Sequence, residues 1–193
     1  MVRQKQFICI LLFSMLTIGK TFAQKDDKTG VSNITKLNFL LPGVSLEQKF
    51  SKFKTIYIFA YLDFFLVKTN SYYGSKSHLN VAPSLDLEFR NYYNFKTRMK
   101  NNLRTEMNSL NYIAPVYTAS YVNSPPNSNK MKLIQQFGAV WGIQRNYPRR
   151  FSLDLNVGLG YLFNATSYSN NNSIWPIAQF TLGVWLNKKV PKS

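Results

Sequence analysis

Apolar and polar residues alternate with a period of two along several long stretches of the chain. The clearest stretch is residues 151–163, FSLDLNVGLGYLF, in which the apolar residues share one parity and Leu162 alone breaks the pattern. Such alternation places apolar side chains on one face of a β-strand and polar side chains on the other. Further alternating stretches are residues 55–66, 84–95, 136–147 and 177–187. The pattern predicts an all-β protein.

The expected strands are long, and the connections between them alternate in length. The strand segments are residues 36–50, 55–67, 81–95, 110–121, 134–147, 151–163 and 174–187. Most exceed the ~9–11 residues that a tilted strand needs to cross an outer membrane. The short connections are 51–54 and 148–150, and the long ones, rich in Ser, Asn and Pro, are 67–80, 122–133 and 164–173. Short turns on one side and long loops on the other are typical of outer-membrane barrels.

The first expected strand segment, residues 36–50, decides the number of strands. Its apolar parity changes at Pro42-Gly43, so the chain either forms a bulge there or turns and yields two short strands. Barrels of this class have an even number of strands. We therefore expect an antiparallel up-and-down transmembrane β-barrel of eight strands with a narrow lumen filled by side chains.

The distribution of glycine and aromatic residues favours apolar faces that point outward. Glycine recurs on the polar face, where it would make room for large side chains inside a narrow barrel. These glycines are Gly138, Gly142, Gly158, Gly160 and Gly183. Aromatic residues gather near the segment ends, as in interfacial girdles, although they favour strands in general. They are Phe50, Phe53, Tyr92, Tyr93, Tyr147, Phe151 and Trp185 at one end, and Phe64, Phe65, Tyr121, Phe163 and Trp175 at the other.

Met99, Leu103 and Met107 predict a brief basic helix within residues 96–109, either on a lipid surface or packed under the barrel.

Charged residues fall repeatedly on the face expected to line the lumen. The expected polar network comprises Glu47, Lys49, Asp63, Asp86, Glu88, Arg90 and Asp154. Charges in a narrow interior must pair or keep water. The network would therefore either plug the barrel or line a small cation-permeable, porin-like pore, and the plug is the preferred interpretation.

The N-terminal region predicts a secretory signal peptide over residues 1–23. Arg3 and Lys5 precede the apolar run 7–18, and a small residue, Ala23, marks the cleavage site. The only cysteine, Cys9, lies inside this segment, so no disulfide is expected in the exported chain. We expect a polar N-terminal segment at 24–34, the barrel at 35–187 and a basic tail at 188–193.

The chain is strongly basic, with 24 Lys and Arg against 8 Asp and Glu. Without the three basic residues of the signal segment, 21 against 8 remain. Because the signal peptide predicts export, outer-membrane lipid is a more natural partner than nucleic acid.

The residues offer little for catalysis or for metal binding. The single histidine, His78, with Ser75, Ser77, Ser84 and Asp86 nearby, is the only basis for an outer-membrane lipid-modifying enzyme. No metal-ligand spacing and no glycine-rich phosphate loop occur, so no catalytic residue, metal or cofactor is predicted. A soluble, secreted lipocalin-like binding barrel is the remaining architecture, and in it the apolar face would point inward.

Several segments resemble the small outer-membrane β-barrel proteins of Bacteroidota. They are LPGVSLEQKF (41–50), RNYYNF (90–95), MNSLNYIAP (107–115), VWGIQRNYPRRFSLDLNVGLGYLF (140–163) and TLGVWLN (181–187). The resemblance covers about residues 35–187 and implies an outer-membrane barrel without an assigned activity. Thr181, Gly183, Val184 and Leu186 also resemble the signal read by barrel-assembly machinery, although KKVPKS follows where the signal usually ends the chain.

Overall fold

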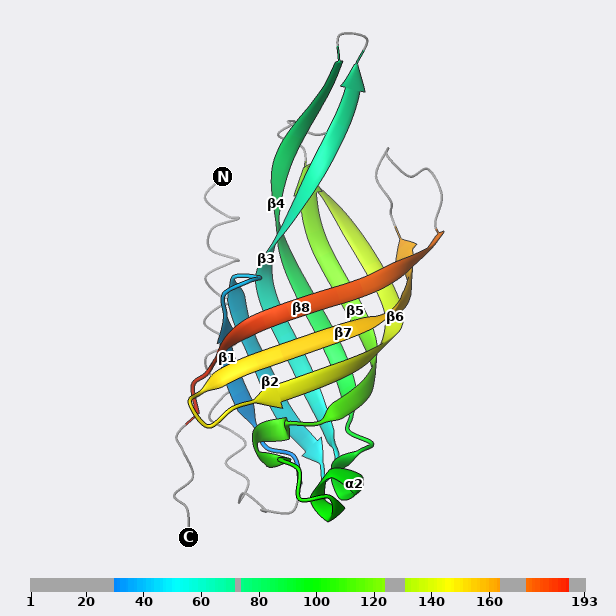
Figure 1. Cartoon of the computed structure of the whole chain (residues 1–193). Helices are drawn as coiled ribbons and strands as arrows, with labels where there is room; N and C mark the ends of the chain where they lie inside the picture. Colours follow the sequence, from blue (N-terminus) through cyan, green and yellow to red (C-terminus); the bar gives the residue numbers. More distant parts are fainter. Residues whose placement is uncertain (1–29, 72–73, 124–130, 164–172, 188–193) are drawn as a thin grey trace, which may run out of the picture.

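Eight antiparallel strands form one sheet that closes on itself, so that each strand pairs with its neighbours in chain order (Figure 1). The structure is a computed structural model, and it describes residues 30–71, 74–123, 131–163 and 173–187. The strands are β1 Ile34–Asn38, β2 Gly43–Ser51, β3 Lys54–Ser71, β4 Gly74–Asn91, β5 Asn111–Asn123, β6 Met131–Asn146, β7 Phe151–Phe163 and β8 Ser173–Trp185. The predicted eight-stranded barrel is confirmed.

The first and last strands close the barrel. In the β1–β8 pair, Lys36 lies opposite Trp185 and Asn38 opposite Gly183. The parity change at Pro42-Gly43 is a turn, because β1 ends at Asn38 and β2 begins at Gly43 and pairs back along it. Closure leaves no row of unpaired backbone groups at a sheet edge.

The two ends of the barrel differ. At one end, named here the short-turn end, lie the turns at 52–53 and 147–150 and the connection 92–110 (Figure 1). At the other, the hairpin end, β3 and β4 extend together well beyond the wall (Figure 1). The predicted signal peptide and the C-terminal tail lie outside the described residues, as do residues 124–130 and 164–172 of the predicted long connections.

Side chains alternate between the two faces of the wall as the sequence pattern predicts. In β7 the buried residues are Ser152, Asp154, Asn156 and Gly160, and the exposed ones are Phe151, Leu155, Val157, Leu159, Tyr161 and Phe163. In β3, Tyr57, Phe59 and Tyr61 are buried while Ile56, Ala60 and Leu62 are exposed. Polar groups and some of the aromatic side chains therefore fill the interior, and aliphatic and other aromatic side chains cover the outside.

The prediction of a long loop over residues 67–80 was wrong. β3 and β4 contain 18 residues each, and their ladder continues to the Ser71–Gly74 pair. Serine and asparagine are frequent there, as in loops, but two strands already in register keep satisfying backbone hydrogen bonds by extending their ladder. The backbone of His78 consequently lies in β4 rather than in a loop; its side chain lies outside the described part.

The connection 92–110 also departs from its prediction. β4 ends at Asn91, so Phe95 turns under the barrel and is buried instead of continuing the apolar outer face. The α-helix α2 spans Phe95–Lys100, and a 3₁₀ turn follows at Glu106–Asn108. Asn102 adopts a positive φ of 53° just after the helix, which stops it before Leu103. Met99 and Leu103 are both exposed, so the expected single helical stripe does not form.

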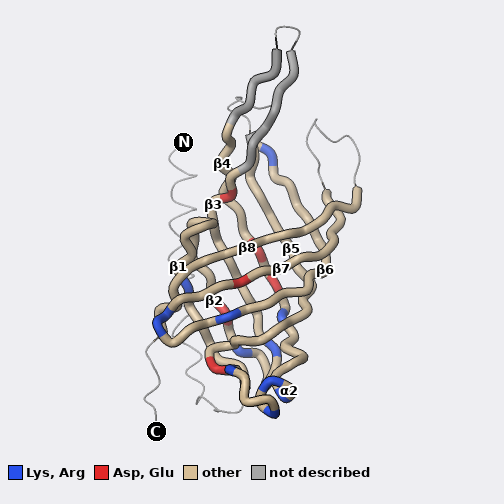
Figure 2. The backbone as a smooth tube through the Cα atoms, viewed as in Figure 1, with Lys and Arg blue, Asp and Glu red and all other residues tan. Residues whose placement is uncertain are grey.

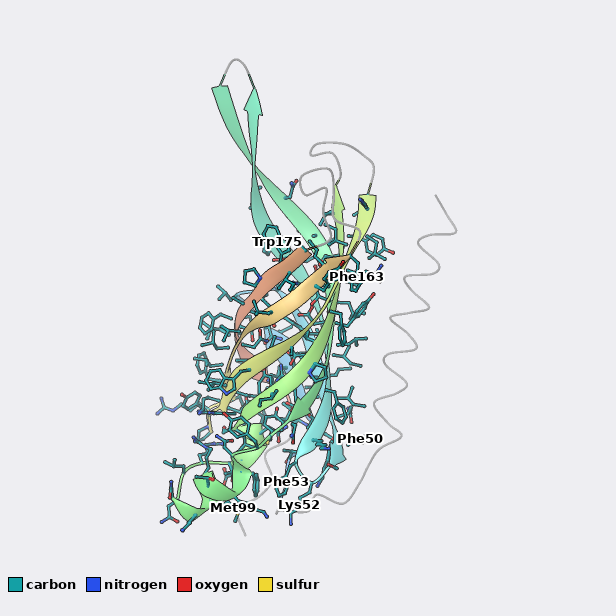
Figure 3. All side chains as sticks on the ribbon, turned by 90° about the vertical axis from the view of Figure 1, so that its right-hand side faces the viewer. Phe50, Lys52, Phe53, Met99, Phe163 and Trp175 are labelled. Carbon is teal, nitrogen blue, oxygen red and sulfur yellow. The ribbon has the colours of Figure 1, made fainter. Side chains whose placement is uncertain are left out.

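The aromatic residues near the strand ends form two groups, with exceptions. Figure 3 shows Phe163 and Trp175 at the hairpin end, and Phe50, Phe53 and Met99 at the short-turn end. Three predicted girdle residues are not on the outer surface: Tyr92 and Trp185 are buried, and Phe53 packs against the inner cluster. Each has the parity of inward-facing residues of the adjoining strand, with Phe53 sharing the parity of Thr55, Tyr92 that of Arg90 and Trp185 that of Gly183, so alternation itself directs them inward. Among the described residues, no helix combines the length and apolarity needed to cross a membrane.

Candidate functional site

Strand alternation brings charged and amide side chains from five strands to the middle of the barrel interior. We name this set the lumen network; its members are Lys36, Glu47, Glu88, Arg90, Gln144 and Asp154. Each is at most 4% exposed. Figure 2 shows acidic and basic positions together within the barrel wall, with further basic positions around α2.

Arg90, on β4, is the centre of the lumen network. Its Nε donates to Glu88 Oε2 at 2.7 Å, two residues away on the same strand face. Its Nη1 donates to Asp154 Oδ2 on β7 at 2.7 Å and to Gln144 Oε1 on β6 at 2.6 Å. One guanidinium thus connects three strands through charge-assisted hydrogen bonds, which are about twice as strong as neutral ones.

Two tyrosine rings enclose the guanidinium. The Arg90 Cζ atom lies 3.6 Å from the centroid of the Tyr57 ring and 4.2 Å from that of Tyr112. Tyr112 also donates its hydroxyl to Asp154 Oδ1 at 2.8 Å. Cation–π contacts and planar stacking suit arginine better than lysine, so both rings orient Arg90 as well as filling space.

Lys36 and Gln144 extend the lumen network toward β2. Lys36 Nζ donates to Gln144 Oε1 at 2.8 Å and lies 3.6 Å from Asp154 Oδ2. Gln144 Nε2 donates to Glu47 Oε2 at 3.0 Å. The other oxygen of Glu47 accepts hydrogen bonds from the hydroxyls of Tyr92 and Thr55, at 2.5 and 2.8 Å. Every charge in the network therefore has an opposite charge or a hydrogen-bond donor beside it.

Gly142 provides the space that Tyr112 occupies. A Cβ at position 142 would lie 2.2 Å from the Tyr112 Cζ atom, so an added methyl displaces the ring. We expect Gly142→Ala to lower the free energy of unfolding by about 1–3 kcal/mol, the usual effect of overpacking. Urea unfolding of the purified protein measures this. In a Tyr112→Ala background the same change should cost far less, and an equal cost in both backgrounds would contradict the steric explanation.

Apolar side chains close the barrel at the short-turn end. Val31, Phe95, Leu110 and Tyr92 pack together with Phe53, and the Phe53 and Phe95 ring centroids are 5.2 Å apart. Hydrogen bonds hold this layer in place: Asn108 Nδ2 donates to the Ser32 carbonyl at 2.9 Å, and Ser109 Oγ donates to the Asn146 carbonyl at 2.9 Å. The N-terminal residues of the described chain thus form part of the closure.

The half of the interior nearer the hairpin end is less filled. It contains a cavity of about 240 Å³. Asp86 lies at this cavity and accepts from Gln179 Nε2 at 2.7 Å and from the Tyr61 hydroxyl at 3.3 Å. Asp63 also lines it, and its Oδ1 accepts the backbone N–H of Phe64 at 2.9 Å.

The structure brings four of the seven predicted lumen residues into direct or one-step contact. Glu88, Arg90 and Asp154 are ion-paired, and Glu47 joins them through Gln144. The other three lie apart. Asp86 and Asp63 line the cavity, and Lys49 is half-buried near the short-turn end, opposite Thr55.

Lys36, Gln144 and the two enclosing tyrosines belong to the site as well, although they were not predicted from the sequence. Lys36 had a usable signal, since it alternates with Leu37 in the same way as Arg90 alternates with Phe89. Gln144 was harder to identify, because alternation around it is loose. Its role depends on the β6–β7 register, which places it opposite Asp154.

The site is built for holding charges in place. Among the described residues, no group of three or more His, Cys, Asp or Glu side chains could hold a metal ion. No protein-family model, curated protein or solved structure matches this chain. The resemblance to small barrels of Bacteroidota therefore stays a prediction from the quoted segments.

Proposed function

We propose that the chain is an integral outer-membrane β-barrel protein whose interior is plugged by its own side chains and whose wall is a scaffold for the segments at the hairpin end. The polarity of the wall carries this proposal. Apolar side chains are exposed around the outside, for example Leu62, Leu87, Trp141, Val157 and Phe180 from five strands. Contiguous apolar surface of this extent is rare on soluble monomers and suits contact with lipid tails.

Strand length supports the same function. β3 to β8 contain 13 to 18 residues each, more than the ~9–11 that a tilted membrane-crossing strand requires. A soluble lipocalin-like barrel would need the opposite polarity, with apolar residues inside. Here the interior holds Arg90, Lys36 and four buried carboxylates, so the observed polarity argues against that alternative.

The filled interior favours a plug over a cation-permeable pore. A path for ions would have to pass both the lumen network and the apolar layer formed by Val31, Phe95 and Leu110. The interior of an eight-stranded barrel is largely filled by its own side chains and has room for one small ligand at most, not for an open aqueous channel. We accordingly propose outer-membrane lipid as the partner of the wall and barrel-assembly machinery as the partner during insertion.

Cell fractionation tests the proposal. We expect the protein to sediment with outer membranes, to need detergent for extraction and to migrate differently on a denaturing gel before and after boiling. A closed barrel with paired strands resists detergent denaturation until it is heated, which causes the shift. Recovery as a soluble periplasmic monomer without detergent would refute the proposed location.

A further inference from the structure

The cavity at the hairpin end is acidic, although the chain as a whole is strongly basic. Its lining includes the carboxylates of Asp63, Asp86 and Glu88 and, among the described residues, no lysine or arginine. The two cations of the lumen network, Lys36 and Arg90, are not part of this lining. The cavity therefore offers negative potential to whatever enters it.

Two buried oxygens in the same lining have no hydrogen-bond donor among the described residues. They are Glu88 Oε1 and Asn156 Oδ1, and their residues are 3% and 4% exposed. Buried acceptors are nearly always paired in native proteins. Both unpaired atoms are hydrogen-bond acceptors, so a ligand group that pairs with them must be a hydrogen-bond donor. This observation is independent of the charge of the cavity and points to the same kind of ligand.

The carboxylates form a row rather than a cluster. Asp63 lies opposite Ala82 in the β3–β4 ladder, four residues from Asp86 on β4. At ~3.4 Å per residue this places the two backbones about 14 Å apart along the strands, with Glu88 a further ~7 Å on. This separation along the strands agrees with the absence of a metal-type cluster among the described side chains. It suits an elongated molecule with several separated positive charges.

We propose that this cavity binds a linear aliphatic polyamine, with its ammonium groups distributed along Asp63, Asp86 and Glu88. Ammonium groups carry three donors each, and the methylenes between them would lie against Val116, Ile177 and the ring of Tyr61, which also line the cavity. The volume of about 240 Å³ is below that of sites for drug-sized ligands, which fits a slender chain. This inference concerns the interior and does not depend on where the protein resides.

Isothermal titration calorimetry of the full chain folded in detergent micelles tests the proposal, with spermidine as the probe. We expect saturable binding that weakens as NaCl is raised, with butylammonium binding far more weakly and 1,4-butanediol not at all. Asp63→Asn should weaken spermidine binding by about tenfold, the effect of losing one charge-assisted hydrogen bond. Asp63 is suited to substitution because its carboxylate lies outside the lumen network.

Glu106→Gln is the matched control, since it removes a carboxylate that is 80% exposed and follows α2 at the other end of the barrel. It should leave the affinity for spermidine unchanged. Heat-modifiable migration verifies that each variant is folded. Equal affinities of wild type and Asp63→Asn would overturn the proposal, as would equal affinities for spermidine and butylammonium. Binding of Ca²⁺ in preference to spermidine would also overturn it, in favour of a metal site.

Discussion

Arg90→Ala is expected to lower the free energy of unfolding by about 3–5 kcal/mol, as for other buried ion pairs that lose one partner. The arginine is fully buried and holds both Glu88 and Asp154 at 2.7 Å. Without it, only Lys36, 3.6 Å from Asp154, remains to balance three buried carboxylates. The loss also empties the space between the Tyr57 and Tyr112 rings.

Two control variants show how much of the lost stability is due to the buried position of Arg90 and how much to its planar guanidinium group. Arg149→Ala removes an exposed arginine from a turn at the short-turn end and should change stability by less than about 0.5 kcal/mol. Arg90→Lys keeps the charge but loses the planar fork, so an intermediate loss is expected. Urea unfolding in lipid vesicles, followed by tryptophan fluorescence, gives the midpoints of all four proteins.

Planar-bilayer recordings of the same proteins distinguish a plug from a pore. If the lumen network plugs the barrel, the wild type conducts no steady current. Arg90→Ala then loses stability against unfolding before it gains any conductance. Stable, cation-selective channels in the wild type, together with an unchanged unfolding midpoint in Arg90→Ala, would contradict the plug.

The second large effect concerns the outer face of the wall. Leu155→Arg is expected to destabilise the protein in a bilayer by about 2–4 kcal/mol, the cost of an arginine facing lipid near mid-membrane. Leu155 is exposed, and its neighbour Asp154 is buried on the opposite face of β7. Leu103→Arg is the matched control, because that leucine is equally a surface residue but follows α2 beyond the barrel wall. It should have little effect.

Unfolding in lipid vesicles measures the stability of both variants. A lipid-soluble quencher checks which side of the barrel wall positions 154 and 155 face. A spin-label quencher in the acyl region should reach a probe at position 155 better than one at position 154. Equal stability of Leu155→Arg and the wild type would argue against lipid around this part of the wall.

Local alternation by itself determined most of the barrel wall. FSLDLNVGLGYLF predicts both the limits of β7 and the burial of Asp154, because a strand turns successive side chains to opposite faces whatever it pairs with. The change of parity at Pro42-Gly43 likewise located the turn that raises seven segments to eight strands. The inward facing of Glu88 and Arg90 follows from the same rule.

Only the tertiary structure decided what happens where strands end and which interior groups meet. Phe95 has the parity of the apolar outer face, yet it is buried, because the chain has left the sheet after Asn91. Residues 67–80 read as a loop by composition, but an existing ladder extended through them. Gln144 is 54 residues from Arg90 and 97 residues from Glu47 in the sequence, and it contacts both only because the closed barrel brings their strands together. Alternation states which face a side chain takes, whereas barrel closure and strand register determine which partner it finds there.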